Sequence, residues 1–435
     1  MPSDTLQTRL SNGLTIHLKE IHTAPLISHW VWYRVGSRDE KPGKTGVSHW
    51  VEHMQFKGTP AYPASVLDRA ISREGGTWNA FTFLDWTAYY ETLPANKIDL
   101  GLRLEADRMV NSLFDAREVE SERTVILTER DENENEPLFR LGEAVQTAAF
   151  SSHPYRHEII GELEDLQSLT RDDLYAHYRR NYVPSNAVVS VAGDFDSAAM
   201  LARLEELYNP LPGGEAIERS LPTEPAPSSE QRIEVKGPGK TTYLQVAYRS
   251  PAAANPDFFA FSVLDSLLTG PSSLNMFGGG GVSNKTSRLY RLLVEKELAV
   301  SISGGLQATI DPFLYDTVAT VHPKSSVEKI LAAYDAEIMR LQDAPVPAAE
   351  IARAIKQARA LFAYGSENIT NQAFWLGYAE MFDSYAWFTD HLERLAQVTP
   401  LDVQRAAQTY LRIDQRVVGI YLPTGEEIAG EEDDE

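Results

Sequence analysis

The chain of 435 residues contains no cysteine. This absence excludes a disulfide framework, a thiolate metal site and a cysteine nucleophile. Any metal ion in this protein would have to be held by histidine, aspartate or glutamate. Because the chain has only ten histidines, a cluster of them would rarely arise by chance and would indicate a metal site.

Basic residues are scarce as well. The 40 Lys and Arg residues stand against 62 Asp and Glu residues, which gives a net charge of −22. A nucleic-acid-binding protein needs a basic patch, so we predict no nucleic-acid partner. We interpret the acidity as a contribution to solubility, with attraction of basic peptides into an acidic cavity as the alternative.

Long apolar runs are missing too. No uninterrupted apolar run approaches the length of a membrane span, and residues 1–10 lack the basic start and apolar core of a signal peptide. We therefore predict no membrane partner and a cytoplasmic location, or a periplasmic one if a leader was removed. The glycine-rich run 277–282 lacks the Gly-Lys-Ser/Thr ending of a P-loop, which favours a mobile loop over a nucleotide site.

The composition that is present is that of a globular protein, with 43% hydrophobic and 23% charged residues. Strand and helix patterns are mixed irregularly, which predicts an α+β fold rather than a doubly wound parallel sheet. Residues 210–231 are rich in Pro, Glu, Ser and Gly and read as a linker. The second half repeats the first in outline, so we predict two similar α+β domains, 1–209 and 232–424, each a mainly antiparallel sheet packed with helices. The acidic residues 425–435 are expected to form a disordered tail.

The strongest local feature is the run His49-Trp50-Val51-Glu52-His53, in a segment whose pattern predicts a helix over 47–56. Positions i and i+4 of a helix share one face, so both imidazoles can point at one metal ion. Glu52 lies between them in angle, where its carboxylate can take a proton from an attacking water. This is the H-x-x-E-H order of the inverted zincins. The alternative is a surface helix that happens to carry two histidines.

A catalytic zinc needs a third protein ligand and one open position. Glu129 is the candidate, because it lies on a predicted helix over 116–131 beside the apolar residues 125–127. Glu122 lies two turns earlier on the same side and could hydrogen-bond a ligand histidine. The residues alone do not separate Glu129 from Glu132 or Glu134, which we interpret as solvated charges of the acidic run 131–136.

The segment 47–59 resembles the signature of the pitrilysin and mitochondrial-processing-peptidase superfamily. In that family a glutamate ligand follows the second histidine by seventy-six positions, which is Glu129 here, and a supporting acid matches Glu122. Further segments match in the right order, and together they extend the resemblance over nearly the whole chain: 36–40, 79–82, 181–186 and 193–195.

The resemblance implies a zinc metalloendopeptidase that cleaves unfolded or short peptides, with Zn²⁺ as cofactor, His49, His53 and Glu129 as ligands and Glu52 as general base. The alternative is a non-catalytic structural or docking subunit of a processing-peptidase-like complex. The resemblance also implies that the peptide substrate pairs as an extra strand with 78–82, through Asn79, Ala80 and Phe81. The alternative for this strand is that these are ordinary sheet residues.

The chain departs from the family in its second half. Many members carry an Arg and a Tyr seven positions apart that help to bind substrate, but Leu293 and Val300 stand at those places here. In some members one subunit keeps the zinc and a paralogous inactive subunit supplies the Arg and the Tyr. The resemblance therefore implies a dimer, and we expect a heterodimer with such a paralogue. A homodimer with altered substrate contacts is the alternative.

Overall fold

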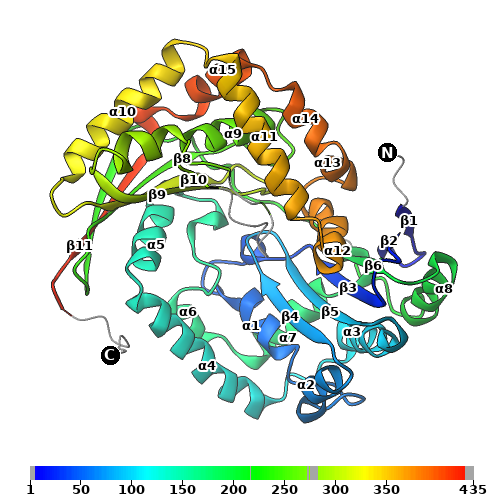
Figure 1. The fold of residues 1–435 in the computed structure, drawn as a ribbon. Helices are drawn as coiled ribbons and strands as arrows, with labels where there is room; N and C mark the ends of the chain where they lie inside the picture. Colours follow the sequence, from blue (N-terminus) through cyan, green and yellow to red (C-terminus); the bar gives the residue numbers. More distant parts are fainter. Residues whose placement is uncertain (1–4, 216, 272–273, 275–282, 427–435) are drawn as a thin grey trace, which may run out of the picture. The chain divides into compact units, whose positions relative to one another are not determined.

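A computed structural model describes residues 5–215, 217–271, 274 and 283–426 (Figure 1). The chain forms two compact units. The first contains Met1–Arg130, His157–Leu221 and Ser366–Thr389, and the second contains Asp131–Arg156, Pro222–Gly365 and Asp390–Glu435. Each unit contains one sheet and its helices.

The first unit contains a six-stranded sheet with the order β1-β2-β6-β3-β5-β4. All neighbouring strands are antiparallel except the parallel pair β2 and β6. β4 lies at one edge, where β5 is its partner in the sheet. The strands are β1 (Thr5–Arg9), β2 (Thr15–Glu20), β3 (Leu26–Tyr33), β4 (Thr77–Thr82), β5 (Thr87–Pro94) and β6 (Ala187–Gly193).

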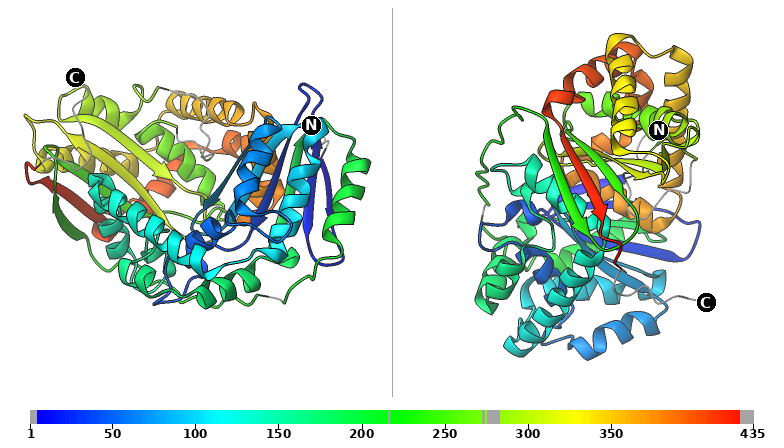
Figure 2. Two further views of the ribbon diagram at one scale, coloured as in Figure 1. Left: turned by 90° about the horizontal axis from the view of Figure 1, so that it is seen from below. Right: turned by 90° about the vertical axis from the view of Figure 1, so that its left-hand side faces the viewer.

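The second unit contains a five-stranded sheet with the order β7-β11-β8-β10-β9. Figure 2 shows β11, in red, between the green strands β7 and β8. From β2 onward, the first sheet follows the same path: in both, the first strand pairs in parallel with the last, and the remaining pairs are antiparallel. The prediction of two similar α+β domains with mainly antiparallel sheets is confirmed. The strands are β7 (Gln231–Gly237), β8 (Tyr243–Arg249), β9 (Ala299–Leu306), β10 (Leu314–Val321) and β11 (Val417–Pro423).

The helices surround these sheets (Figure 1). The first unit holds α1 (Val47–Met54), α2 (Ala64–Arg73), α3 (Asp99–Asn111), α6 (Leu163–Ser168), α7 (Arg171–Asn181), α8 (Ser197–Tyr208), α12 (Ile369–Tyr378) and α13 (Tyr385–Thr389). The second holds α5 (Pro137–Ala149), α9 (Asp257–Leu268), α10 (Val327–Asp343), α11 (Ala348–Tyr364), α14 (His391–Gln397) and α15 (Pro400–Tyr410). α4 (Ala116–Asn135) passes from one unit into the other.

The two halves of the sequence exchange one helix each. α12, from the second half, packs on β3 and β6 of the first sheet, and α5, from the first half, packs on β7, β8 and β11 of the second.

The domain boundaries predicted at 209 and 232 divide the sequence into two consecutive segments, and they stay a prediction. β7 begins at Gln231, the last residue of the predicted linker. The glycine-rich run 277–282 and the tail from 427 onward lie outside the described residues.

The contact between α12 and the first sheet is tight enough to exclude a methyl group. A Cβ atom on Gly377 would lie 2.2 Å from Nε1 of Trp32, a fully buried side chain. Over-packing of this kind costs about 1–3 kcal/mol, which exceeds the ~1 kcal/mol that alanine gains over glycine in a helix. We expect Gly377→Ala to lower the free energy of unfolding in urea titrations. Gly142 on α5 is the control, because its added Cβ would meet no atom within 4 Å and Gly142→Ala should be neutral or stabilising.

The described residues between α8 and β7 are held by specific contacts although they form no helix or strand. In the first unit, Arg219 Nε donates to Asp39 over 2.6 Å. In the second, the Glu224 carboxylate accepts the backbone N–H groups of Ser151, Ser152 and His153 over 2.7–2.8 Å. Burial opposes ionisation of Glu224, but these donors prevail and hold its pKa at about 2.

The lowered pKa predicts how the stability of the second unit depends on pH. The Glu224 carboxylate stabilises the folded state above its ordinary pKa of 4.5, and this contribution is lost as the pH falls toward 2. We expect Glu224→Gln to lower the unfolding free energy by about 1–2 kcal/mol at neutral pH, allowing for solvent screening. The difference from wild type should vanish in melts near pH 2. The exposed Glu218 of the same segment provides the control, Glu218→Gln, which should show no such difference.

Candidate metal centre

Helix α1 presents the H-x-x-E-H residues because its opposite face is anchored in the core. Val47, Trp50, Val51 and Met54 are buried at helical spacing. The residue before the helix is Gly46, whose φ of 81° is in the left-handed region that favours glycine.

The start of α1 is capped by a buried carboxylate. Glu40 accepts the backbone N–H groups of Gly46 and Ser48, each over 2.8 Å. These are among the N–H groups that a helix start leaves without partners. Burial raises the pKa of Glu40 to about 8, although the two hydrogen bonds oppose that shift. Glu40 thereby holds the first turn of the helix that carries His49.

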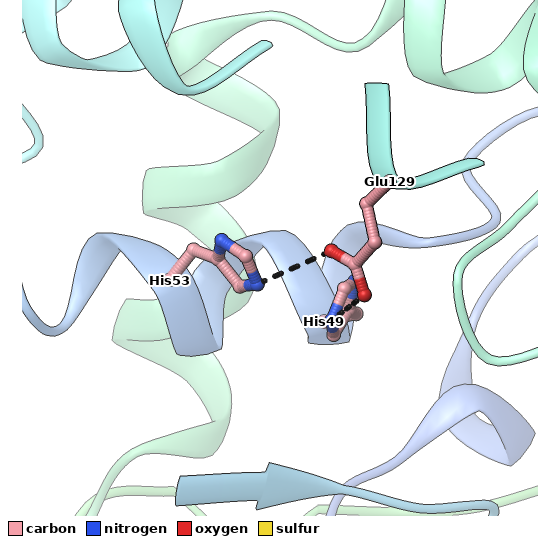
Figure 3. A group of neighbouring side chains, drawn as sticks. All are labelled: His49, His53 and Glu129. Atoms are coloured by element: carbon pink, nitrogen blue, oxygen red, sulfur yellow. Dashed lines mark ion pairs between the residues drawn. The ribbon is translucent and has the colours of Figure 1, made fainter. Parts of the chain in front are cut away.

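The structure brings His49, His53 and Glu129 together (Figure 3). The Nε2 atoms of His49 and His53 each lie 3.7 Å from a carboxylate oxygen of Glu129, which α4 supplies. One potential ligand atom from each residue lies within 4.8 Å of the others. This arrangement favours Glu129 over Glu132, which is exposed.

The two histidines have opposite electrostatic surroundings. Burial lowers the pKa of His49 to about 3, and the neighbouring His53 adds to this shift. Burial also acts to lower the pKa of His53, but the hydrogen bond to Glu122 and the nearby carboxylates outweigh it and the pKa is raised. His49 is therefore neutral at physiological pH, as a metal ligand must be.

Glu122 supports His53 from behind. Nδ1 of His53 donates to Oε1 of Glu122 over 2.9 Å, which directs Nε2, on the other side of the ring, toward Glu129. The other carboxylate oxygen of Glu122 forms an ion pair with Lys57, one turn after His53. Burial acts to raise the pKa of Glu122, but the contacts with His53 and Lys57 together outweigh it and the pKa is lowered.

Glu52 is 8% exposed and its carboxylate is held in place. Its Oε2 accepts a hydrogen bond from the Thr82 hydroxyl over 2.6 Å. Burial raises the pKa of Glu52 to about 7, while the Thr82 hydrogen bond acts to lower it. A carboxylate with a pKa near neutrality is suited to general acid–base chemistry.

The predicted peptide-binding residues lie on the edge strand β4, next to α1 (Figure 1). Asn79 is exposed, Ala80 is buried and Phe81 is half-buried. The Asn79 side chain accepts the backbone N–H of Ala80 over 2.9 Å. In the second unit, Leu293 is fully buried and Val300 is 54% exposed.

Three supporting residues were not predicted from the sequence: Glu40, Lys57 and Thr82. Each lies in a segment that carried the family resemblance, but no local pattern indicated its contact. Glu40 and Thr82 reach α1 from a preceding loop and from a strand, and such contacts depend on tertiary structure. Lys57 follows His53 by four residues but lies beyond the end of α1, so helical spacing did not indicate its contact.

Among the described residues, no helix combines the length and apolar character needed to cross a bilayer. The cytoplasmic location stays a prediction.

Two models of one peptidase family match most of the chain. The model described as "Insulinase (Peptidase family M16)" matches residues 15–162, and "Peptidase M16 inactive domain" matches residues 168–358. An uncharacterised zinc protease of Mycobacterium leprae is 28% identical over 427 residues, which covers 95% of this chain and 92% of the relative. The beta subunit of the mitochondrial-processing peptidase of Blastocladiella emersonii is 27% identical over 409 residues, covering 94% and 86%. The solved structure of a Helicobacter pylori protease aligns with a TM-score of 0.87 and 26% identity, covering 96% of this chain and 99% of that one.

Proposed function

This chain belongs to peptidase family M16, the pitrilysin and mitochondrial-processing-peptidase superfamily, and from that premise we propose that it is a zinc metalloendopeptidase acting on unfolded or short peptides. The observation that carries the proposal is the convergence of His49, His53 and Glu129 beside the buried Glu52. Relatives named zinc proteases support the same activity.

The donor set fits zinc. Two imidazole nitrogens and one carboxylate oxygen are ligands of a catalytic zinc site, which keeps a fourth position open. The low pKa of His49 leaves its Nε2 free to bind a cation, whereas the raised pKa of His53 means that its Nε2 must release a proton when the cation binds. Glu129 would complete the set, and Glu122 would keep His53 in its orientation.

When zinc is bound, it polarises the scissile carbonyl and makes water a stronger nucleophile. The remaining steps fall to the residues of α1. Glu52 takes the proton of the attacking water and passes it to the leaving amine. Its pKa of about 7 supports both transfers, since the carboxylate must first accept and then release a proton.

The peptide would bind along β4. Because β4 is the edge strand of its sheet, a peptide can add as a further strand through backbone hydrogen bonds. The backbone N–H of Ala80 donates to the Asn79 side chain in this structure. We propose that a backbone carbonyl of the bound peptide replaces Asn79 as the acceptor. Asn79, Ala80 and Phe81 are thus the proposed substrate contacts.

We propose a heterodimer as the working assembly. Neither the buried Leu293 nor the exposed Val300 can donate a side-chain hydrogen bond to a substrate. The likeness to a protein named as the beta subunit of a processing peptidase supports a subunit role. A homodimer remains the alternative assembly.

The alternative function is a non-catalytic docking subunit, but the intact Glu52, His49, His53 and Glu129 favour catalysis.

Cleavage of an unstructured quenched-fluorescent peptide by the purified chain tests the proposal, with bound metal quantified in the same sample. We expect zinc near one equivalent and cleavage that a chelator abolishes and zinc restores. Zinc without cleavage would support a missing partner subunit or the docking role, and adding a paralogous chain that carries the Arg and the Tyr would separate these. A chain that binds no zinc would contradict the proposal.

A further inference from the structure

The hydroxyl of Thr82 links the proposed base to the strand proposed to bind peptide. Thr82 is the last residue of β4, and its Oγ1 donates to Oε2 of Glu52 over 2.6 Å. Both residues are only 8% exposed, so little water competes for this hydrogen bond. A buried hydrogen bond to a carboxylate is among the stronger polar contacts in proteins.

The hydroxyl of Thr82 is confined on its other side by Thr87. Thr87 is fully buried at the start of β5 and pairs with Thr82 across the strands. Its Oγ1 donates to the backbone carbonyl of Val35 over 2.9 Å and lies 3.3 Å from Oγ1 of Thr82. Since each hydroxyl gives its one hydrogen to another acceptor, the two threonines are in contact without a hydrogen bond between them, and Thr87 limits the space into which the Thr82 hydroxyl could turn.

We propose that Thr82 is a positioning residue that holds the Glu52 carboxylate in its working orientation and couples it to peptide bound on β4. This inference rests on the proposed peptidase function. The terminal torsion of a glutamate side chain is broad, so α1 alone leaves the carboxylate free to turn. The Thr82 hydrogen bond removes that freedom. Because Thr82 belongs to the proposed peptide strand, a shift of β4 on binding would move the base together with the substrate.

Thr82→Val tests the inference, because valine keeps the branched shape and the strand preference of threonine and removes only the hydroxyl. We expect kcat to fall about 10- to 100-fold, the range seen when supporting residues of metal sites are removed, with KM changed less than about 3-fold. Zinc content and melting temperature should stay those of wild type. Thr82→Ser should restore kcat, since serine supplies the same donor. Thr8→Val, in β1 of the same sheet, is the control.

A crystal structure of the Thr82→Val protein supplies a readout that does not depend on activity. We expect the Glu52 carboxylate to have left the position that it occupies in wild type, while His49 and His53 stay in place. An unmoved carboxylate, or a kcat within twofold of wild type, would overturn the inference. If Thr82→Val does not fold, Thr82→Ala is measured in the same way.

Failure of the proposed function would look different. In that case wild type would not cleave peptide, or Glu52→Gln would cleave it as well as wild type. The position of the Glu52 carboxylate in the crystal structures of wild type and Thr82→Val would still decide whether Thr82 holds it.

Discussion

The Glu52→Gln protein is expected to bind zinc as wild type does and to lose peptide cleavage by about 10²- to 10⁴-fold in kcat, the range that a positioned acid–base group contributes. Glutamine has the same shape as glutamate and can still accept the hydrogen bond of Thr82, so the fold and the ligand set should persist. It cannot take a proton from water. The loss should therefore fall on kcat, with KM little changed.

The control for Glu52→Gln is Glu132→Gln, which removes an exposed carboxylate of α4 three residues from Glu129. It changes the net charge by the same amount, so a general electrostatic effect would appear in both variants. Full activity in Glu52→Gln would remove Glu52 from the mechanism. Loss of zinc from this variant would instead mean that Glu52 is a ligand.

The pair of histidines could be predicted from the sequence because their geometry is local. A helix fixes where residues i and i+4 point, and the run His49–His53 needs no tertiary information to form one face. The same holds for the apolar positions 47, 50, 51 and 54, which the core buries.

The third residue of the cluster could not be identified from the local sequence pattern alone. Glu129, Glu132 and Glu134 are chemically equivalent in the sequence, and only the path of α4 decides which of them reaches α1. The spacing of the resembling family pointed to Glu129, and the geometry agrees with that choice. Its role as a ligand stays a prediction until metal is measured.

Long-range contacts account for what could not be predicted. The hydrogen bond from Thr82 to Glu52 joins residues thirty positions apart, and no local pattern in either segment indicates this contact. The exchange of α5 and α12 is non-local in the same sense. α5 carries a clear apolar spacing in Leu141 and Val145, but nothing in that spacing says which sheet it covers.

Removal of a proposed ligand should abolish zinc binding, not merely slow cleavage. We expect His49→Ala, His53→Ala and Glu129→Ala each to weaken zinc binding by more than the roughly 10- to 100-fold that loss of a supporting residue causes. Two remaining protein ligands are too few for a catalytic zinc site. Metal analysis after dialysis, and competition with a chromophoric chelator, measure the affinity. His22→Ala, which removes an exposed histidine, is the control.

The zinc affinity of a Glu122 variant should lie between that of wild type and those of the ligand variants. This ranking of affinities is a sharper test than the loss of zinc alone. Glu122→Gln keeps an oxygen that can accept from His53 but removes the charge that Lys57 neutralises. We therefore expect zinc affinity to decrease by about 10- to 100-fold, less than in any ligand variant. A ligand variant that keeps its zinc would exclude that residue from the metal centre. If Glu122→Gln lost zinc as completely as His53→Ala, Glu122 itself would have to be a ligand, since an orienting hydrogen bond alone does not account for so large a loss.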